Sequence, residues 1–421
     1  MWRDGWLGRN ARRVAAQAVQ SGLQRLAESS RQGGLPGLDL VLPNGERIHF
    51  GNGAEVVLTV RDDGMLATLA HPTIAELAEG YVEGRLDVDG PMLRAVAIAE
   101  HLAESNGAPV SARVAAALGR HSPRHDKEAV SYHYDVGNDF YQAWLDERMI
   151  YSCAYFRTGN ESIDEAQVAK LDHICRKLRL AQDERLLDIG CGWGGLVMHA
   201  VRNYGVRAVG ITLSENQFRL ANERIAQVGL SDRAEVLLLD YRDALARFGS
   251  ESFDKVSSIG MFEHVGLRNL ATYFGIVRDL LKERGLFLNH GITSVDIDNR
   301  PVGSGVSAFI DKYVFPQGEL PHLHVVVREM AGQAFEVFDV ESLRPHYAHT
   351  LARWSTRFEA KLSELRHTTP DKTLRIWRAY LGGCSHGFAQ NWLNIYQVLG
   401  SKQTRPGLTR LPLTRDWIYP P

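Results

Sequence analysis

Short apolar runs recur through the second half of the chain, and each one ends in glycine or in polar residues. Runs of this length, bounded by such residues, are typical of strands that are buried on both faces of a sheet. The pattern therefore predicts an α/β domain with an open sheet. The expected strands are 186–189, 208–211, 234–239, 253–259, 285–289, 335–338 and 391–398.

The N-terminal part of the chain has a different pattern, in which turn dipeptides separate short apolar segments. Asn-Gly and Asp-Gly favour the two-residue turns of β-hairpins. The predicted hairpins are 38–42 with 47–50 around Asn44-Gly45, and 56–60 with 65–69 around Asp63-Gly64. Helices are expected over 72–83 and 92–104, so the pattern indicates a small α+β domain over 1–108.

Two further segments bound this domain. Residues 1–28 are helix-prone and carry Trp2 and Trp6, but their apolar positions drift around the helix. This drift favours packing against the next domain over a position on a membrane surface. Residues 109–130 have no stable pattern and are interpreted as a linker, which leaves 131–421 as the second domain.

The sequence RLLDIGCGWGG at 185–195 is the centre of the second domain. Its apolar run contains Asp188 and then breaks into glycines that include Gly190, Gly192 and Gly194. Glycines allow backbone N–H groups to approach a ligand closely, and the helix that follows presents a positive end. The stretch predicts a site for a nucleotide-like ligand, although glycines after a strand can also mark only a tight turn.

The ends of the next two strands narrow the choice of ligand. A dinucleotide site requires an acidic residue about 20 positions after the glycines, at the end of the second strand. Here the predicted strand at 208–211 is followed by Thr212 and Leu213 and leads to Gln217. The loop also lacks the lysine of a triphosphate site. D-x-G-C-G-x-G-G followed by T-L-S-x-x-Q resembles the S-adenosylmethionine loop of class I methyltransferases, which have a Rossmann-like fold. Tyr241 and Arg242 are then expected near the adenine.

Residues 131–156 are dense in aromatic side chains. Such density usually marks a core, but polar residues such as His133 interleave with the rings, which is unusual for a purely structural core. Tyr151, Ser152 and Cys153 close the stretch. Because aromatic faces stabilise cations, including a sulfonium, we expect this stretch to cover the cofactor and to form one wall of the substrate site.

Two titratable residues follow neighbouring predicted strands. Glu263 comes after the strand at 253–259, and His290 comes after the strand at 285–289. Ligands of open α/β sheets lie beyond the carboxyl ends of the strands. Glu263 alone could cap a helix, and His290 alone could be a core histidine. Their occurrence together at adjacent strand ends favours a chemical role.

Composition excludes several classes of protein. The chain has 421 residues, 44% of them hydrophobic and 23% charged, and a net charge of −2, which gives no indication of nucleic-acid binding. No apolar run approaches the roughly 18 residues that span a bilayer. We therefore expect a cytoplasmic protein that touches membranes only at their surface. The four scattered cysteines include no C-x-x-C pair and predict neither a disulfide framework nor a metal site.

Seven motifs occur in an order that resembles one family, the cyclopropane-fatty-acyl-phospholipid synthases, which are related to the mycolic acid cyclopropane synthases. They are HYDVGNDFY, YSCAYF, LLDIGCGWGG, GITLSENQ, SIGMFEHVG, YVFPQGELP and GGCSHGF, and together they cover essentially 131–400. The N-terminal α+β domain makes the chain resemble the long bacterial enzymes more than the short mycolate ones. This domain has no cluster of titratable groups, and we expect it to pack, to contact a second subunit or to present lipid.

The resemblance implies a reaction, a cofactor and a base. S-adenosylmethionine would give a methylene group to the cis double bond of a phospholipid acyl chain at the membrane surface, and bound bicarbonate would remove the proton that lets the ring close. The implied bicarbonate ligands are Cys153, Glu263, His290, the backbone of Ile292, and Tyr347. The implied cofactor contacts are Tyr151, Ser152, Asp188, Gly190, Gly192, Gly194, Thr212, Leu213, Gln217, Tyr241 and Arg242.

Some expectations stay open at this point. Cys384 matches a cysteine often marked in this family, but the chemistry needs no covalent enzyme intermediate, and a small buried thiol is the simpler interpretation. A homodimer is implied by the family. The product could instead be a methyl- or methylene-branched acyl chain, or the chain could be a non-catalytic lipid- or cofactor-binding subunit, although the complete set of base-binding residues favours ring formation.

Overall fold

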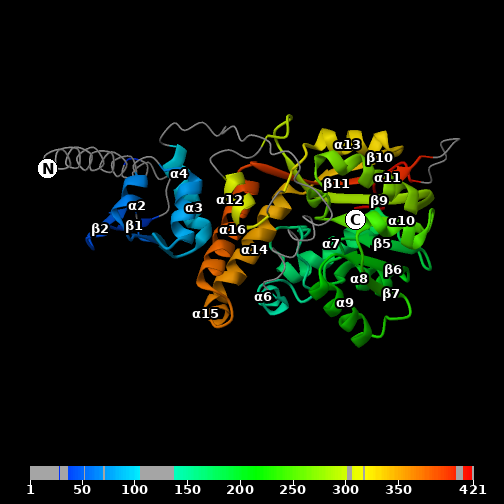
Figure 1. Ribbon diagram of the computed structural model, residues 1–421, viewed down its shortest axis with the longest axis horizontal. Coiled ribbons are helices and arrows are strands. Elements are labelled where there is room, and N and C mark those ends of the chain that lie inside the picture. Colours follow the sequence, from blue (N-terminus) through cyan, green and yellow to red (C-terminus); the bar gives the residue numbers. More distant parts are fainter. Residues whose placement is uncertain are drawn as a thin grey trace, which may run out of the picture. The chain divides into compact units, whose positions relative to one another are not determined.

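The computed structural model describes residues 28, 37–51, 53–69, 72–104, 137–300, 306–315, 318–403 and 411–419 (Figure 1). The expected linker over 109–130, nearly all of the expected helix over 1–28, and His133 lie outside these ranges. Contacts along the chain divide it into two units, which are described separately. Unit 1 comprises Met1–Ala115, Val302–Val314 and Ser355–His386, and unit 2 comprises Ala116–Pro301, Phe315–Trp354 and Gly387–Pro421.

Unit 1 contains a four-stranded sheet of order β2-β1-β3-β4. Strands β1 and β2 pair antiparallel, so the first predicted hairpin is confirmed. Its N-terminal elements are β1 Leu38–Val41, β2 Arg47–Phe50, β3 Val56–Val60, α2 Asp63–Thr68, α3 Ile74–Val82, β4 Leu86–Asp89 and α4 Met92–Glu104. Its later elements are α12 Val306–Tyr313, α15 Leu362–Leu365, the end of α14 Arg344–Ala360 and most of α16 Asp371–Ala389.

The second predicted hairpin is wrong, because Asp63 and Gly64 lie in helix α2. The Asp62 side chain accepts a hydrogen bond from Met65 N at 2.8 Å and so caps this helix. Both Asp62 carboxylate oxygens also accept from the Arg85 guanidinium, at 2.9 and 2.8 Å. Strand β3 pairs instead with β1 on one side and, antiparallel, with β4 on the other, and β4 is a strand that the turn pattern did not predict.

The first boundary between the units, after Ala115, falls inside the expected linker. Residues 355–386, expected within the second domain, group with unit 1 instead. In that unit Arg375 of α16 binds Asp87 at 2.6 Å, and Arg378 binds Glu359 at 2.7 Å. The domain limits 1–108 and 131–421 themselves stay a prediction.

Unit 2 contains a seven-stranded sheet of order β10-β11-β9-β8-β5-β6-β7. The five strands from β9 to β7 are parallel; β11 pairs antiparallel with β9, and β10 pairs antiparallel with β11, so β11 runs against the other six strands of this sheet. The strands are β5 Arg185–Ile189, β6 Arg207–Thr212, β7 Ala234–Leu238, β8 Phe253–Ile259, β9 Leu281–Ser294, β10 Phe335–Ser342 and β11 Leu393–Lys402. All seven predicted strands are therefore present, as the α/β prediction required.

Two apolar layers cover the faces of this sheet. One contains residues of α11 and α13, including Phe274 and Met330, and the other contains residues of α7, α8 and α9, including Ile174 and Val197. The helices of unit 2 are α6 Asn138–Gln142, α7 Ile163–Lys177, α8 Gly195–Tyr204, α9 Glu215–Gln227, α10 Ala244–Phe248, α11 Leu270–Leu280, α13 Leu323–Gly332 and the first part of α14, with 3-10 turns at Tyr241–Asp243, Phe262–His264 and Leu267–Asn269. The sheet is thus wound on both sides, with its carboxyl edge open to a ligand.

Candidate active site

A cavity of about 1140 Å³, counted out to its open mouth, lies at the carboxyl ends of β5, β6 and β8. Strand β5 pairs with β6 on one side and with β8 on the other, so the strand order changes direction at β5. Open α/β sheets bind ligands at this position. The walls come from 149–152, from α7, from the glycine loop after β5, and from the segments that follow β6, β7 and β8.

The glycine loop needs its glycines for backbone conformation. Gly190, Gly192 and Gly194 have φ values of 77°, 54° and 77°, in the left-handed region that L side chains rarely adopt. A Cβ atom at Gly190 would also lie 3.0 Å from the Met261 side chain. Gly194 is the N-cap of α8 and makes no side-chain capping bond. At Gly190 and Gly192 the loop therefore presents main chain to the cavity, and Cys191 and Trp193 of the same loop also line it.

The end of β6 forms a small closed network. Thr212 Oγ1 donates to Gln217 Oε1 at 2.8 Å, and Ser214 Oγ accepts from Gln217 N at 3.3 Å and caps α9. Thr212, Leu213 and Gln217 all line the cavity. The T-L-S-x-x-Q motif thus begins a helix and shapes the ligand site with the same residues.

Two residues that follow β7 form another wall of the cavity. The Arg242 guanidinium lies 5.3 Å from the centre of the Tyr241 ring and binds the Asp240 carboxylate, with Nη2 and Oδ2 2.6 Å apart. Tyr241 and Arg242 line the cavity. An aromatic face held in place by a paired cation suits a stacked purine ring.

The structure brings the predicted cofactor residues together around this cavity, except for Gly194, which does not line it. A Cβ atom at Gly194 would contact Ala221 and Val236, so this glycine lets α8 pack closely. The sequence reasoning missed Lys170 and Trp193, which also line the cavity. The sequence offered no local signal for Lys170, because whether a helical lysine is buried depends on what packs over it.

The aromatic stretch is mainly core. Phe140, Tyr141 and Trp144 are at most 3% exposed. Tyr151 lies against Trp144, with ring centroids 5.6 Å apart, and lines the cavity. The described part of this stretch therefore supplies one aromatic wall and a buried backing for it.

Glu263 is buried at the start of the loop after β8. Its Oε1 accepts a hydrogen bond from Ile292 N at 2.7 Å, and its Oε2 has no partner among the described residues. Burial raises the pKa of Glu263 to about 7, against the opposing hydrogen bond from Ile292. Its carboxyl group can therefore exchange a proton near neutral pH.

His290 and Ile292 lie within β9, because this strand continues past Asn289, where the sequence prediction ended it. Gln397 pairs with His290 across the sheet, and its Nε2 is 3.3 Å from His290 Nδ1. Burial lowers the pKa of His290 well below its usual range. The neutral ring that accepts at Nδ1 carries its proton on Nε2, an atom that has no partner within the described ranges.

Cys153 and Tyr347 lie where the segment before α7 meets the start of α14. Cys153 Sγ donates to Leu343 O at 3.8 Å, and Ala154 N donates to Thr350 Oγ1 at 3.0 Å. Burial raises the pKa of the Cys153 thiol, so the group stays protonated and acts as a donor. Tyr347 is buried, with its ring centroid 4.7 Å from that of Phe388.

Cys384 differs from the other candidate residues. It belongs to unit 1 and does not line the cavity. Burial raises the pKa of its thiol to about 12, which disfavours the thiolate that a nucleophile requires. No group of three His, Cys, Asp or Glu residues suited to a metal ion occurs in the described part of the chain.

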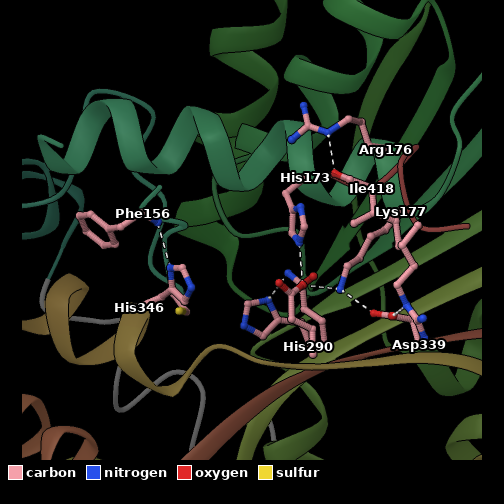
Figure 2. A network of polar contacts seen from close by, with 12 residues as sticks. Phe156, His173, Arg176, Lys177, His290, Asp339, His346 and Ile418 are labelled. Atoms are coloured by element: carbon pink, nitrogen blue, oxygen red, sulfur yellow. Dashed lines mark hydrogen bonds and ion pairs between the residues drawn. The ribbon is translucent and has the colours of Figure 1, made fainter. Parts of the chain in front are cut away.

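A second region of buried polar side chains lies toward the C-terminal end of α7, around His173 and Lys177 (Figure 2). Glu341 of β10 receives His173 Nε2 at 2.7 Å and Lys177 Nζ at 2.5 Å, and Lys177 also pairs with Asp339 at 3.2 Å. Burial acts to raise the pKa of Glu341, but the hydrogen bond from His173 and the charge of Lys177 lower it to about 2. Cross-strand pairing of Glu341 with Gln397, and of Gln397 with His290, joins this region to the candidate base site.

The sheet, the glycine loop and the cavity together define an S-adenosylmethionine-dependent methyltransferase. Solved structures agree: the cyclopropane synthase MmaA2 from Mycobacterium tuberculosis is 32% identical with a TM-score of 0.62, covering 66% of this chain and 98% of that one. Mycolic acid cyclopropane synthase CmaA1, complexed with SAH (S-adenosylhomocysteine) and CTAB, is 34% identical with a TM-score of 0.61 and the same coverage.

Sequence comparison gives the family. Residues 121–398 match the family model of mycolic acid cyclopropane synthetase, and the chain belongs to this family. A probable fatty acid methyltransferase of Pseudomonas putida is 45% identical over 387 residues, which are 91% of this chain and 96% of that protein. The cyclopropane-fatty-acyl-phospholipid synthase of Escherichia coli strain K12 is 38% identical over 276 residues, which are 66% of this chain and 68% of that protein.

Proposed function

We propose that the chain transfers a methylene group from S-adenosylmethionine to the cis double bond of an unsaturated phospholipid acyl chain and forms a cyclopropane ring, with bicarbonate as the base. The observation that carries this proposal is a pair of buried polar atoms, Glu263 Oε2 and His290 Nε2, that have no partner among the described residues. Unpaired buried polar atoms are uncommon in proteins, and each calls for an explanation such as a bound water, ion or ligand.

The residues present fit a small oxyanion. His290 Nε2 offers an N–H donor, and Glu263 can accept a proton. The single S–H of Cys153 donates to Leu343 O in this structure and would have to turn to become a second donor. The Ile292 N–H was expected to bind the anion directly, but it donates to Glu263 Oε1 and so orients the carboxylate. A Cβ atom at Gly291 would lie 1.8 Å from the Phe262 ring, so only glycine fits between His290 and Ile292.

The chemistry explains why a base is needed. The electrons of the double bond attack the methyl carbon of the sulfonium, the carbon–sulfur bond breaks, and S-adenosylhomocysteine leaves with that electron pair. The ring closes when a proton leaves the transferred methyl group and its C–H electrons form the second carbon–carbon bond. Bicarbonate supplies the base for this proton. Glu263 and His290 hold that base, and Tyr151 offers an aromatic face to the cationic donor.

A second product is favoured by one observation, since the Pseudomonas relative with 45% identity is named a probable fatty acid methyltransferase. In that case the carbocation would lose a proton from a neighbouring chain carbon and give a methyl-branched chain that keeps a double bond. Alternatively, a hydride would shift from the methylated carbon to the cationic carbon, and loss of a proton from the transferred methyl group would then give a methylene branch. The same methyl donor and cavity serve both reactions, so only the product distinguishes them.

The deciding experiment is product analysis with purified protein, labelled methyl donor and vesicles of cis-unsaturated phospholipid, in CO₂-depleted buffer with and without added bicarbonate. We expect lipid that gains one CH₂, loses its olefinic proton signals and shows ring protons upfield of the methyl region, at a rate that bicarbonate restores. Olefinic or new methyl signals would support branching. No transfer of label would favour a binding subunit.

Glu263→Gln should lower the rate of ring formation by about 100- to 1,000-fold, because it removes the proton acceptor next to the bound base. The affinity for S-adenosylhomocysteine should stay unchanged, since Glu263 does not line the cofactor cavity. Glu283→Gln, at an exposed position of β9, is the matched control. Equal rates for both variants would remove Glu263 from the mechanism.

We further propose that the acyl chain is reached at the membrane surface and that two copies of the chain form a dimer. Within the described ranges, no helix is long and apolar enough to cross a membrane. Flotation with phospholipid vesicles and light scattering of the purified protein test these two proposals independently of the product.

A further inference from the structure

Lys170 is a buried cation at the wall of the cofactor cavity. It lies in α7, and the residue as a whole is 2% exposed. Its Nζ donates to Ser152 Oγ at 2.8 Å. Lys170, Ser152, Asp188, Gly190 and Gly192 all line the cavity. The ammonium group therefore lies on the ligand side of the helix rather than in a closed core.

The charge of Lys170 is not paired within the part of the chain that the structure describes, where no carboxylate oxygen lies within 4.0 Å of its Nζ. Asp188, the acidic residue of the same wall, accepts instead from Ser257 Oγ at 2.7 Å. A buried charge without an opposite charge is strongly unfavourable. Burial accordingly lowers the pKa of Lys170 to about 8, although the charges of Asp146 and Asp188 act to raise it.

The chemistry of the donor supplies the missing charge. S-adenosylmethionine carries one carboxylate, on its methionine part, and a carboxylate taken out of water requires a cation or several N–H donors. Lys170 is the lysine that lines the cavity, whereas the base-site residues Glu263 and His290 do not line it. We propose that Lys170 is a cofactor-binding residue that pairs with the carboxylate of the methionine part.

This assignment does not depend on which acyl product the enzyme makes, because it concerns the binding of the methyl donor alone. It also gives the cavity a polarity: a cationic wall of α7 for the amino-acid part, and the wall of Tyr241 and Arg242 for the adenine. The cavity should therefore bind a methyl donor that has its carboxylate more tightly than one that lacks it.

The test is a cycle of two ligands and two proteins, measured by isothermal titration in bicarbonate-free buffer at pH 7. The ligands are S-adenosylhomocysteine and its decarboxylated analogue, and the proteins are wild type and Lys170→Met. We expect the variant to lose about 10- to 100-fold in affinity for S-adenosylhomocysteine, the worth of one charge-assisted contact. Its affinity for the decarboxylated analogue should change by less than about twofold.

Lys255→Met is the matched control, because Lys255 is also buried in unit 2 but does not line the cavity and pairs with Glu184 at 3.4 Å. It should leave the preference for S-adenosylhomocysteine unchanged. Lys170→Arg, which keeps the charge, should retain part of that preference.

Three results would overturn the proposal. Equal losses for both ligands would mean that Lys170 only supports the fold of the cavity. An unchanged affinity for S-adenosylhomocysteine would mean that the carboxylate binds elsewhere. If added bicarbonate alters ligand affinity in wild type but not in Lys170→Met, the lysine serves the base anion instead. Failure of ring formation with an intact ligand preference would reject the proposed function and leave this inference standing.

Discussion

Helix α7 carries two buried lysines about two turns apart that satisfy their charge in opposite ways. Lys177 pairs with two carboxylates, Glu341 at 2.5 Å and Asp339 at 3.2 Å. Lys170 donates to the neutral hydroxyl of Ser152 at 2.8 Å. Helix, residue type and burial are the same, so the difference lies in the counter-charge. The fold completes one site, and the other is left for a ligand to complete.

Replacing the two lysines should therefore have different effects on the stability of the protein. Lys177→Met should lower the free energy of unfolding by about 3–5 kcal/mol, because it leaves Glu341 and Asp339 buried without their common cation. Lys170→Met removes an unpaired charge and should be at least as stable as wild type without ligand. Urea unfolding followed by circular dichroism measures both. Similar losses in the two variants would abolish the distinction between the two sites.

The pH dependence of stability sharpens the same contrast. The pKa of Lys170 falls from 10.5 in the unfolded chain to about 8 in the folded protein. As pH falls from 10.5 toward 8, the unfolded chain takes up this proton first, so wild type should lose about 3 kcal/mol relative to Lys170→Met. Below pH 8 the difference should stay constant. Unfolding curves of both proteins at several pH values test this, and a flat difference from pH 8 to 10.5 would contradict it.

The sheet could be predicted from sequence because each of its strands is a local apolar run with a clear end. The cofactor wall could be predicted for the same reason, since Gly190, Gly192, Thr212 and Gln217 follow those runs directly. The limits of β9 could not, because its pairing with β11, a strand about a hundred residues later, extends it through His290 and Ile292.

Other features depended on contacts that no local pattern contains. Asp63-Gly64 fits the sequence pattern of a hairpin turn, but Asp62 also fits the pattern of a helix N-cap. In the structure Asp62 caps α2 and also accepts hydrogen bonds from Arg85. Lys170 could not be separated from a solvent-exposed lysine, because whether a helical lysine is buried depends on what packs over it. The counter-charge of Lys177 lies on β10, more than 160 residues away.

The smallest effect is expected at Gln397, which lies between the two regions. Its Nε2 donates to His290 Nδ1 at 3.3 Å, and across the sheet it pairs with Glu341. Gln397→Met frees His290 to adopt the other tautomer, in which Nε2 no longer donates. Turnover should fall by about three- to tenfold, the worth of one neutral hydrogen bond.

Stability should change little in this variant, because Gln397 Oε1 has no partner among the described residues and its loss offsets the lost bond. The affinity for S-adenosylhomocysteine should also be unchanged, and Gln403→Met, at an exposed position just past β11, is the control. The nitrogen chemical shifts of the His290 ring report the tautomer directly. A ring that keeps its proton on Nε2 in Gln397→Met would show that the tautomer is set by the anion site and not by the strand behind it.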